Sequence, residues 1–167
     1  MVMEGAGTMP VITMLNQKGG VGKTSTCHHL AGTMALAGRR VLLIDNDPQA
    51  SLTQGFWGPL AARQIDRAET VAALYAGDEP YPDQIIKPTG IASIDLVPGS
   101  KHATRFNVPM PHEADPAIQE CMRDFLADVR HRYYPGKIDR HRVVTRIGWS
   151  RAASAVRFVR ILVAGVI

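Results

Sequence analysis

The chain has 167 residues, two cysteines and a formal net charge of +4 at pH 7, and 46% of its residues are hydrophobic. A chain of this length can bury roughly 70% of its unfolded surface in one domain. Two cysteines exclude a disulfide scaffold, and the first nine residues lack a charged segment followed by an apolar core. These features predict a reducing, cytoplasmic location, and residues 156–167 are too short and too rich in arginine to span a bilayer.

The first predicted elements are a strand, a glycine turn and a helix, in that order. Residues 11–15 form a short apolar run that is typical of a strand. The glycines of the following turn tolerate a positive φ and let the backbone approach a ligand. A helix is then predicted up to Gly38, because apolar residues recur at helical spacing, namely Cys27, Leu30, Ala31 and Met34.

The glycine turn nearly fits the phosphate-loop pattern G-x-x-x-x-G-K-[ST]. Gly22, Lys23 and Thr24 supply the last three positions, whereas Gln17 stands where the pattern has its first glycine. Lys18 follows at once and, with Lys23, brackets a turn whose backbone N–H groups can cradle phosphates. In this interpretation Lys23 contacts the β- and γ-phosphates of a nucleotide, and the Thr24 hydroxyl helps to hold Mg²⁺. The alternative is a glycine-rich turn with two solvated lysines.

A second group of candidate residues follows the next strand. Residues 41–44 are a continuous apolar run, which is typical of a strand buried on both faces. Asp45 and Asp47 come directly after it, at the edge where open parallel sheets bind ligands. Asp47 could accept a hydrogen bond from a Mg²⁺-bound or attacking water, and Asp45 could support the metal shell. The alternative is a solvated strand end, which the spacing after the phosphate loop makes the weaker reading.

Residues 18–25 and 41–49 together resemble the ParA/MinD family of deviant Walker A ATPases. The Asp-Pro-Gln turn at residues 47–49 is closer to the ParA branch than to the MinD branch. The resemblance extends over about residues 11–132. It implies an α/β fold with a P-loop NTPase-type, mostly parallel sheet flanked by helices, with ATP and Mg²⁺ as ligands and an ATP-dependent sandwich homodimer.

The resemblance also implies a role for each matching residue. In the family, the lysine that matches Lys18 reaches the partner subunit's nucleotide, and the residue that matches Gly19 lies at the dimer contact. Asp47 matches the switch I aspartate that is associated with hydrolysis, so Lys18 and Asp47 are the implied catalytic residues. The implied magnesium ligands are Thr24, Asp45 and Asp47. The implied nucleotide contacts are Lys18, Gly19, Gly20, Val21, Gly22, Lys23, Thr24 and Ser25.

The middle of the chain is typical of α/β proteins. Thr70 is expected to cap a helix that ends before Gly77, and residues 85–86 are assigned to a short strand. Asp95 is interpreted as a structural residue within a strand. Asp115-Pro116 is a typical helix start. The core face of that helix is predicted to hold Ile118, Met122, Phe125, Leu126 and Val129, with Cys121 as a buried thiol.

The end of the chain departs from the family pattern. No apolar strand with a Walker B turn follows residue 132, so the sheet is expected to be incomplete at its C-terminal side. Residues 1–132 have a net charge of −2, whereas residues 133–167 have a net charge of +6. Residues 1–132 are therefore interpreted as the N-terminal part of a ParA-like ATPase domain. Residues 133–167 are a basic tail that is a frameshift product, a nucleic-acid-binding arm or an amphipathic interfacial helix.

These observations favour an ATPase, converting ATP and water to ADP and phosphate, in DNA partition or intracellular positioning. Two alternatives stay open: a nucleotide-binding remnant without turnover, and a basic-tailed module that associates with DNA or membrane. Non-specific DNA and an activating partner protein are the further partners that remain open, and membrane is the less favoured one. Missing strands would leave apolar surface and sheet edges uncovered, so marginal stability is expected.

Overall fold

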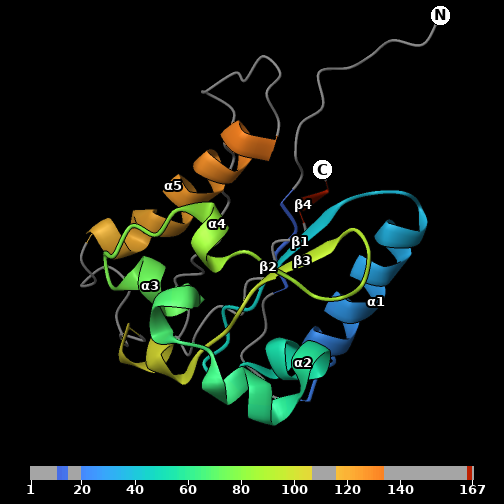
Figure 1. The fold of residues 1–167 in the computed structure, drawn as a ribbon, viewed down its shortest axis with the longest axis horizontal. Coiled ribbons are helices and arrows are strands. Elements are labelled where there is room, and N and C mark those ends of the chain that lie inside the picture. Colours follow the sequence, from blue (N-terminus) through green and yellow to red (C-terminus); the bar gives the residue numbers. More distant parts are fainter. Residues whose placement is uncertain (1–10, 15–19, 107–115, 134–164, 167) are drawn as a thin grey trace, which may run out of the picture.

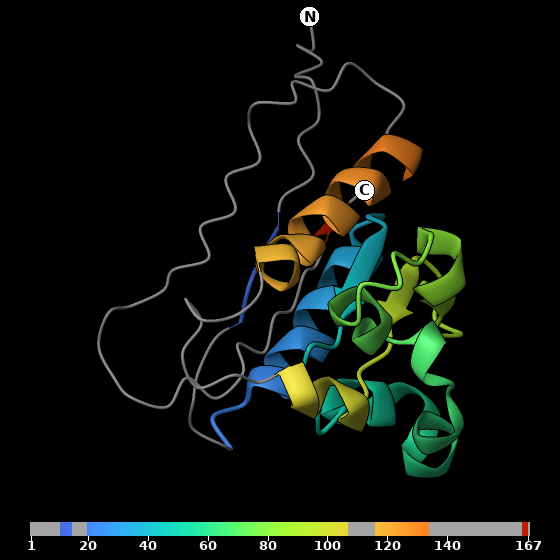
Figure 2. The same ribbon diagram turned by 90° about the vertical axis from the view of Figure 1, so that its left-hand side faces the viewer.

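The computed structural model describes residues 11–14, 20–106, 116–133 and 165–166, which form a mixed α/β structure around a small sheet (Figure 1). Helices lie on both sides of this sheet, as the turned view in Figure 2 also shows. The elements in chain order are α1 (Lys23–Leu36), β1 (Val41–Ile44), α2 (Ser51–Gln64), η1 (Arg67–Glu69), α3 (Val71–Tyr75), α4 (Pro82–Ile85), β2 (Lys87–Pro88), β3 (Ile94–Val97), η2 (Lys101–Phe106), α5 (Pro116–Tyr133) and β4 (Gly165–Val166).

The sheet has the strand order β2-β3-β1-β4 and is built on a parallel central pair. β1 and β3 run parallel, with Val41 opposite Ile94 and Ile44 opposite Val97. β2 is antiparallel to β3, and β4 is antiparallel to β1 over two residues of each strand. The carboxyl ends of β1 and β3 therefore meet at one edge of the sheet. The predicted α/β class is confirmed.

The central strand is buried on both faces, as its continuous apolar run predicts. Successive side chains of a strand point to opposite faces. Leu42 and Ile44 accordingly belong to one hydrophobic cluster, with residues of α3 and α5, whereas Val41 and Leu43 belong to a second, with residues of α1 and α2. The two clusters fix the helices against the sheet.

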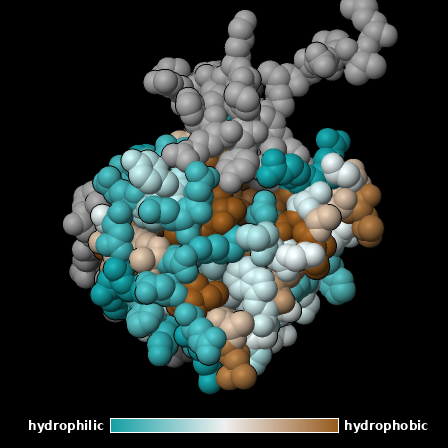
Figure 3. Space-filling view, viewed as in Figure 1, coloured by the Kyte–Doolittle hydropathy of each residue, from teal (hydrophilic) through white to brown (hydrophobic). Residues whose placement is uncertain are grey.

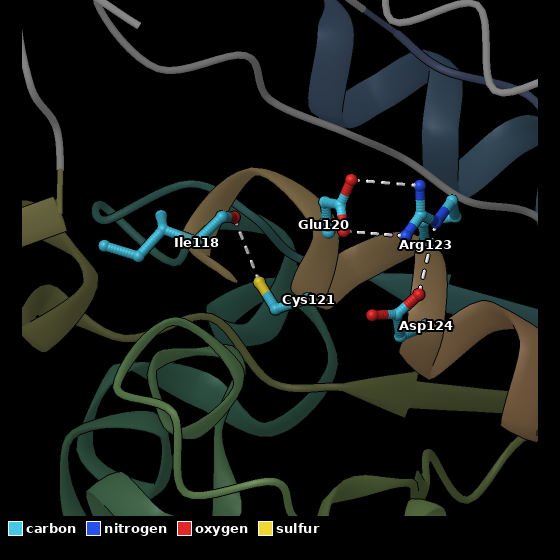
Figure 4. Close-up of polar contacts among 5 residues, drawn as sticks. All are labelled: Ile118, Glu120, Cys121, Arg123 and Asp124. Carbon is cyan, nitrogen blue, oxygen red and sulfur yellow. Dashed lines mark hydrogen bonds and ion pairs between the residues drawn. The ribbon is translucent and has the colours of Figure 1, made fainter. Parts of the chain in front are cut away.

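Helix α5 covers the first cluster with the face that its apolar spacing predicts. Met122, Phe125, Leu126 and Val129 are buried, and Ile118 is half-buried. Cys121 is partly rather than fully buried, and its thiol donates to the Ile118 carbonyl at 3.2 Å (Figure 4). The outer face carries Arg123, which is paired with the carboxylates of Glu120 and Asp124.

Two short-range predictions are wrong. Residues 85–86 are not a strand, because Pro82 begins the short helix α4 and Ile85 ends it, so that β2 starts only at Lys87. Of the strand predicted at residues 11–15, residues 11–14 form no strand either, since they make no ladder with the described sheet, and Leu15 lies outside the described residues. Val11 and Met14 instead pack against the first and the second cluster, respectively.

Other expectations for this part of the chain are confirmed. The Thr70 hydroxyl caps α3 by accepting a hydrogen bond from the Ala72 N–H, and Asp95 lies within β3. In the view of Figure 3, hydrophilic residues separate the hydrophobic areas of the surface. The described helices include none that is long and apolar enough to cross a membrane. The predictions for the basic tail fall almost entirely outside the described residues.

Candidate functional site

The predicted phosphate turn ends at an uncapped helix N-terminus. Gly20 and Gly22 both adopt the left-handed backbone region, with φ of 72° and 81°. An added Cβ would meet nothing within 4 Å at either position, so the backbone conformation rather than space requires glycine there. Gly22 is the N-cap of α1 and no side-chain hydrogen bond caps that helix. Its first-turn N–H groups and its dipole are thus directed at the turn, which suits an anion.

The described residues of the turn lie at the surface beside the sheet. Lys23 and Thr24 are half-buried at the start of α1, whereas Val21 and Ser25 are exposed. The predicted site residues Lys18 and Gly19 lie outside the described residues. Thr26 N–H donates to the Gly22 carbonyl at 2.8 Å, which begins the helical ladder at Gly22. The order of turn, lysine and helix therefore agrees with the phosphate-loop prediction.

Asp45 is buried directly after β1, and both of its carboxylate oxygens accept hydrogen bonds. Its Oδ2 accepts from the Thr53 backbone N–H at 2.8 Å and from the Thr53 hydroxyl at 2.7 Å. Its Oδ1 accepts from the Asp47 N–H at 3.3 Å. Burial raises the pKa of Asp45 to about 6, while the hydrogen bonds from Thr53 work in the opposite direction.

Asp47 is buried in a tight turn that leads into α2. Its Oδ1 accepts from the Gln49 N–H at 3.0 Å, and its carbonyl accepts from the Ala50 N–H at 2.7 Å. Ala50, the N-cap of α2, adopts a left-handed backbone with φ of 52°. These local bonds hold the Asp47 carboxylate at the carboxyl edge of the sheet, where the sequence predicts it.

The turn is also joined to the end of β3. The Asp45 N–H donates to the Val97 carbonyl at 3.0 Å, and the Gly99 N–H donates to the Thr53 hydroxyl at 2.8 Å. Sequence reasoning missed Thr53 as a functional candidate. Its contacts lie 8 and 46 residues away along the chain, and no local pattern carries a signal over such separations.

The residues present fit a nucleotide with Mg²⁺. Among the described residues no group of three or more His, Cys, Asp or Glu side chains could hold a metal. Mg²⁺ usually needs no such cage, since it binds through one or two carboxylates together with substrate phosphates and water. The uncapped start of α1, with Lys23 and Thr24, suits the phosphates. The buried Asp47 supplies a carboxylate, the type of oxygen ligand that Mg²⁺ prefers.

A pocket of about 250 Å³ lies beside the turn that follows Asp47. Its lining includes Pro48 and Ala50 of the turn, Arg63 of α2, and Lys101 and His102 of η2. Of the predicted nucleotide contacts, those among the described residues (20–25) do not line it. Its lining therefore does not overlap with the described part of the candidate site at the start of α1.

Comparisons with known proteins agree with this geometry. An AAA domain family model matches residues 9–139. The chain is 32% identical over 125 residues to the chromosome partitioning protein ParA of Caulobacter vibrioides, covering 75% of this chain and 44% of that protein. It is 39% identical over 90 residues to the sporulation initiation inhibitor protein Soj of Bacillus subtilis, covering 54% of this chain and 34% of that protein.

Solved structures share the fold. A plasmid partition protein from Borrelia burgdorferi matches with a TM-score of 0.60 at 24% identity, covering 72% of this chain and 50% of that one. The cobyrinic acid a,c-diamide synthase from Mycobacterium smegmatis, solved with an ATP analog and magnesium, matches with a TM-score of 0.56 at 27% identity, covering 68% and 43%. The chain spans less than half the length of the two curated relatives named above. With its family model and its partition relatives, the chain belongs to the ParA/MinD family of P-loop ATPases.

Proposed function

We propose that this chain is the nucleotide-binding part of a ParA-type partition ATPase, which binds Mg²⁺-ATP at the start of α1 and couples hydrolysis to dimerisation. The observation that carries the proposal is the Asp47 turn, held at the carboxyl edge of a parallel strand pair, together with the uncapped N-terminus of α1. The shared hydrophobic cluster of α1, β1 and α2 holds these two parts of the site together.

Each residue has a defined part in this proposal. The first-turn N–H groups of α1 bind the phosphates, Lys23 balances the charge on the β- and γ-phosphates, and the Thr24 hydroxyl is a magnesium ligand. Bound Mg²⁺ would neutralise the charge that develops on the transferred phosphoryl group. Asp47 accepts a hydrogen bond from the attacking water or from a metal-bound water. Asp45, proposed to support the metal shell, would do so while it also holds the Asp47 backbone.

The wider assignments are proposals that rest on the family. Lys18 would reach the nucleotide of a second subunit in an ATP-dependent homodimer, with Gly19 at the contact between the subunits. An activating partner protein and non-specific DNA are the proposed further partners. The proposed location is the cytoplasm, where the two unpaired cysteines would stay reduced.

Mg²⁺-dependent ATP binding and turnover by the purified chain test the proposal. Lys23→Ala should abolish binding, because the loop loses the side chain that faces the phosphates. Lys87→Ala, which removes a surface lysine paired with Glu69, is the matched control and should leave binding unchanged. Binding without turnover would favour the alternative of a nucleotide-binding remnant. A folded chain that does not bind ATP would refute the proposal.

The charge distribution favours a second candidate function, DNA binding by the tail. Residues 133–167 have a net charge of +6, whereas the rest of the chain is slightly acidic. Replacing Arg140, Arg142, Arg146 and Arg151 by Gln should weaken duplex binding and flatten its salt dependence, while Lys23→Ala should change neither. Equal DNA binding by the two variants would exclude the tail as the DNA contact. Binding of the parent chain to anionic vesicles, lost in the fourfold arginine variant, would instead support the membrane alternative.

A further inference from the structure

The Thr53 hydroxyl lies between the ends of two strands. Thr53 is fully buried in the first turn of α2. Its Oγ1 donates to Asp45 Oδ2 at 2.7 Å, and the same oxygen accepts from the Gly99 N–H at 2.8 Å. Asp45 follows β1 and Gly99 follows β3, so a single hydroxyl connects both strand ends to α2.

The carboxylate of Asp45 extends this connection to Asp47. While its Oδ2 is held by Thr53, its Oδ1 accepts from the Asp47 N–H. The backbone of Gly99 lies close against Asp45, since a Cβ added to Gly99 would be 2.7 Å from Asp45 Cγ. The path from β3 to the Asp47 backbone therefore consists of three buried, directional contacts.

Helix α2 also packs against the sheet through apolar side chains. Leu52 is buried in the second hydrophobic cluster, and Phe56 and Trp57 of the same helix pack against that cluster. Apolar contacts of this kind attach a helix without specifying the position of a neighbouring turn to a few tenths of an ångström. The hydrogen bonds of Thr53 supply that directional constraint.

We propose that Thr53 is a positioning residue, which holds the Asp45–Asp47 turn against the end of β3 and so fixes the Asp47 carboxylate for hydrolysis. The inference rests on the proposed function for its catalytic consequence only. Its structural content, a turn held through the Thr53 hydroxyl, can be tested without nucleotide.

Three variants isolate the hydroxyl. Thr53→Val has nearly the same shape, keeps the backbone N–H bond to Asp45 and removes both hydroxyl bonds. Thr53→Ser restores the hydroxyl. Thr33→Val is the matched control, because the Thr33 hydroxyl is exposed and donates to the His29 carbonyl of its own helix.

Hydrogen–deuterium exchange of the full chain without nucleotide is the first measurement. In Thr53→Val, the amides of residues 46, 47, 49 and 50 and of Gly99 should exchange roughly tenfold faster or more, because both hydrogen bonds of the hydroxyl are lost. Thr53→Ser and Thr33→Val should match the parent chain. If a folded Thr53→Val exchanges like the parent, the inference is refuted. If Thr53→Val does not fold, by circular dichroism, Thr53→Ala replaces it and the same two outcomes apply.

Turnover is the second measurement. Thr53→Val should lower kcat more than it weakens the Kd for Mg²⁺-ATP, because its hydrogen bonds go to Asp45 and Gly99 and not to the described part of the phosphate loop, residues 20–25. Combined with Asp47→Ala, it should cause no further loss, since both changes would act through one carboxylate. Equal losses in kcat and in affinity would point to a merely structural role and overturn the catalytic part. A parent chain that fails to bind ATP refutes the proposed function, whereas the exchange result still decides whether Thr53 holds the turn.

Discussion

Gly99 lies so close to Asp45 that a side chain at this position must displace its neighbours. A Cβ there would be 2.7 Å from Asp45 Cγ and 2.9 Å from the Asp45 carbonyl oxygen. We therefore expect Gly99→Ala to lower the free energy of unfolding by about 1–3 kcal/mol, the usual cost of overpacking a buried site. Urea unfolding followed by circular dichroism measures this change.

Gly32→Ala is the matched control for this substitution. Gly32 lies inside α1, and a Cβ there would meet nothing within 4 Å. The same added methyl group should stabilise the chain by roughly 0.5–1 kcal/mol, because alanine loses less backbone entropy in a helix. If both variants shift stability in the same direction, the close contact at Gly99 does not govern the result.

The two thiols should react slowly in the folded chain. Burial raises the pKa of Cys27 to about 11, and the nearby Asp45 charge adds to the effect. Burial likewise raises the pKa of Cys121 to about 11. Because the thiolate is the nucleophile, a two-unit rise lowers its fraction at pH 8 roughly 100-fold.

Alkylation by iodoacetamide tests this expectation. At pH 8 the native chain should react far more slowly than the chain in urea, and the native rate should rise about tenfold per pH unit while the fold persists. Cys27→Ser and Cys121→Ser assign each rate to one thiol. A native rate equal to the unfolded rate would show that neither thiol has a raised pKa.

At the scale of residues, local patterns predicted the positions of the candidate side chains better than their contacts. The spacing of Asp45 and Asp47 after an apolar strand correctly placed both at the carboxyl edge of the sheet. The contacts of Thr53 could not be predicted, because one of them is to Gly99, which the fold brings near through the pairing of β1 with β3. The partial burial of Cys121 was missed for a similar reason, since helical spacing predicts which face of the helix a side chain lies on but not how deeply it is buried.

At the scale of elements, α5 shows why periodicity is a strong predictor. Its buried face follows the helical repeat, and Phe125 packs in the first cluster with residues of β1 and α3. We expect Phe125→Ala to lower the free energy of unfolding by about 3–5 kcal/mol, through lost transfer free energy and a cavity. Thermal unfolding by calorimetry is the measurement.

The outer face of α5 offers the control for this prediction. Asp128 is exposed on the same helix, and Asp128→Ala should change stability by less than about 0.5 kcal/mol. Comparable losses in the two variants would mean that α5 does not cover the cluster. The wrong assignments at residues 11–14 and 85–86 show the limit of periodicity. A short apolar run has the same pattern in a strand, in a coil and at the end of a helix, so its sequence does not distinguish them.

At the scale of the molecule, the stability of the sheet depends on how completely its central strand β1 is paired with neighbouring strands. β1 pairs with β3 along its whole length, whereas β4 pairs only with Val41 and Leu42. Within the described part of the sheet, Leu43 and Ile44 thus have a ladder partner on one side. The sequence predicted an incomplete sheet from the missing Walker B strand, but it could not predict that β4 lies beside β1, since that contact joins residues more than 120 positions apart.

Removing β4 tests how much this partial cover contributes. Deleting residues 165–167 leaves β1 as an apolar edge strand in the described sheet, and such edges pair with other chains. We expect unfolding stability to fall by about 1 kcal/mol, the scale of one or two strand pairs, and sedimentation to show association that increases with concentration. Val166→Thr keeps the backbone ladder and a β-branched side chain, so it should remain monomeric at the same concentrations. A truncated chain as stable and as monomeric as the parent would show that β4 contributes nothing to the sheet, and that the edge of β1 is protected by other means.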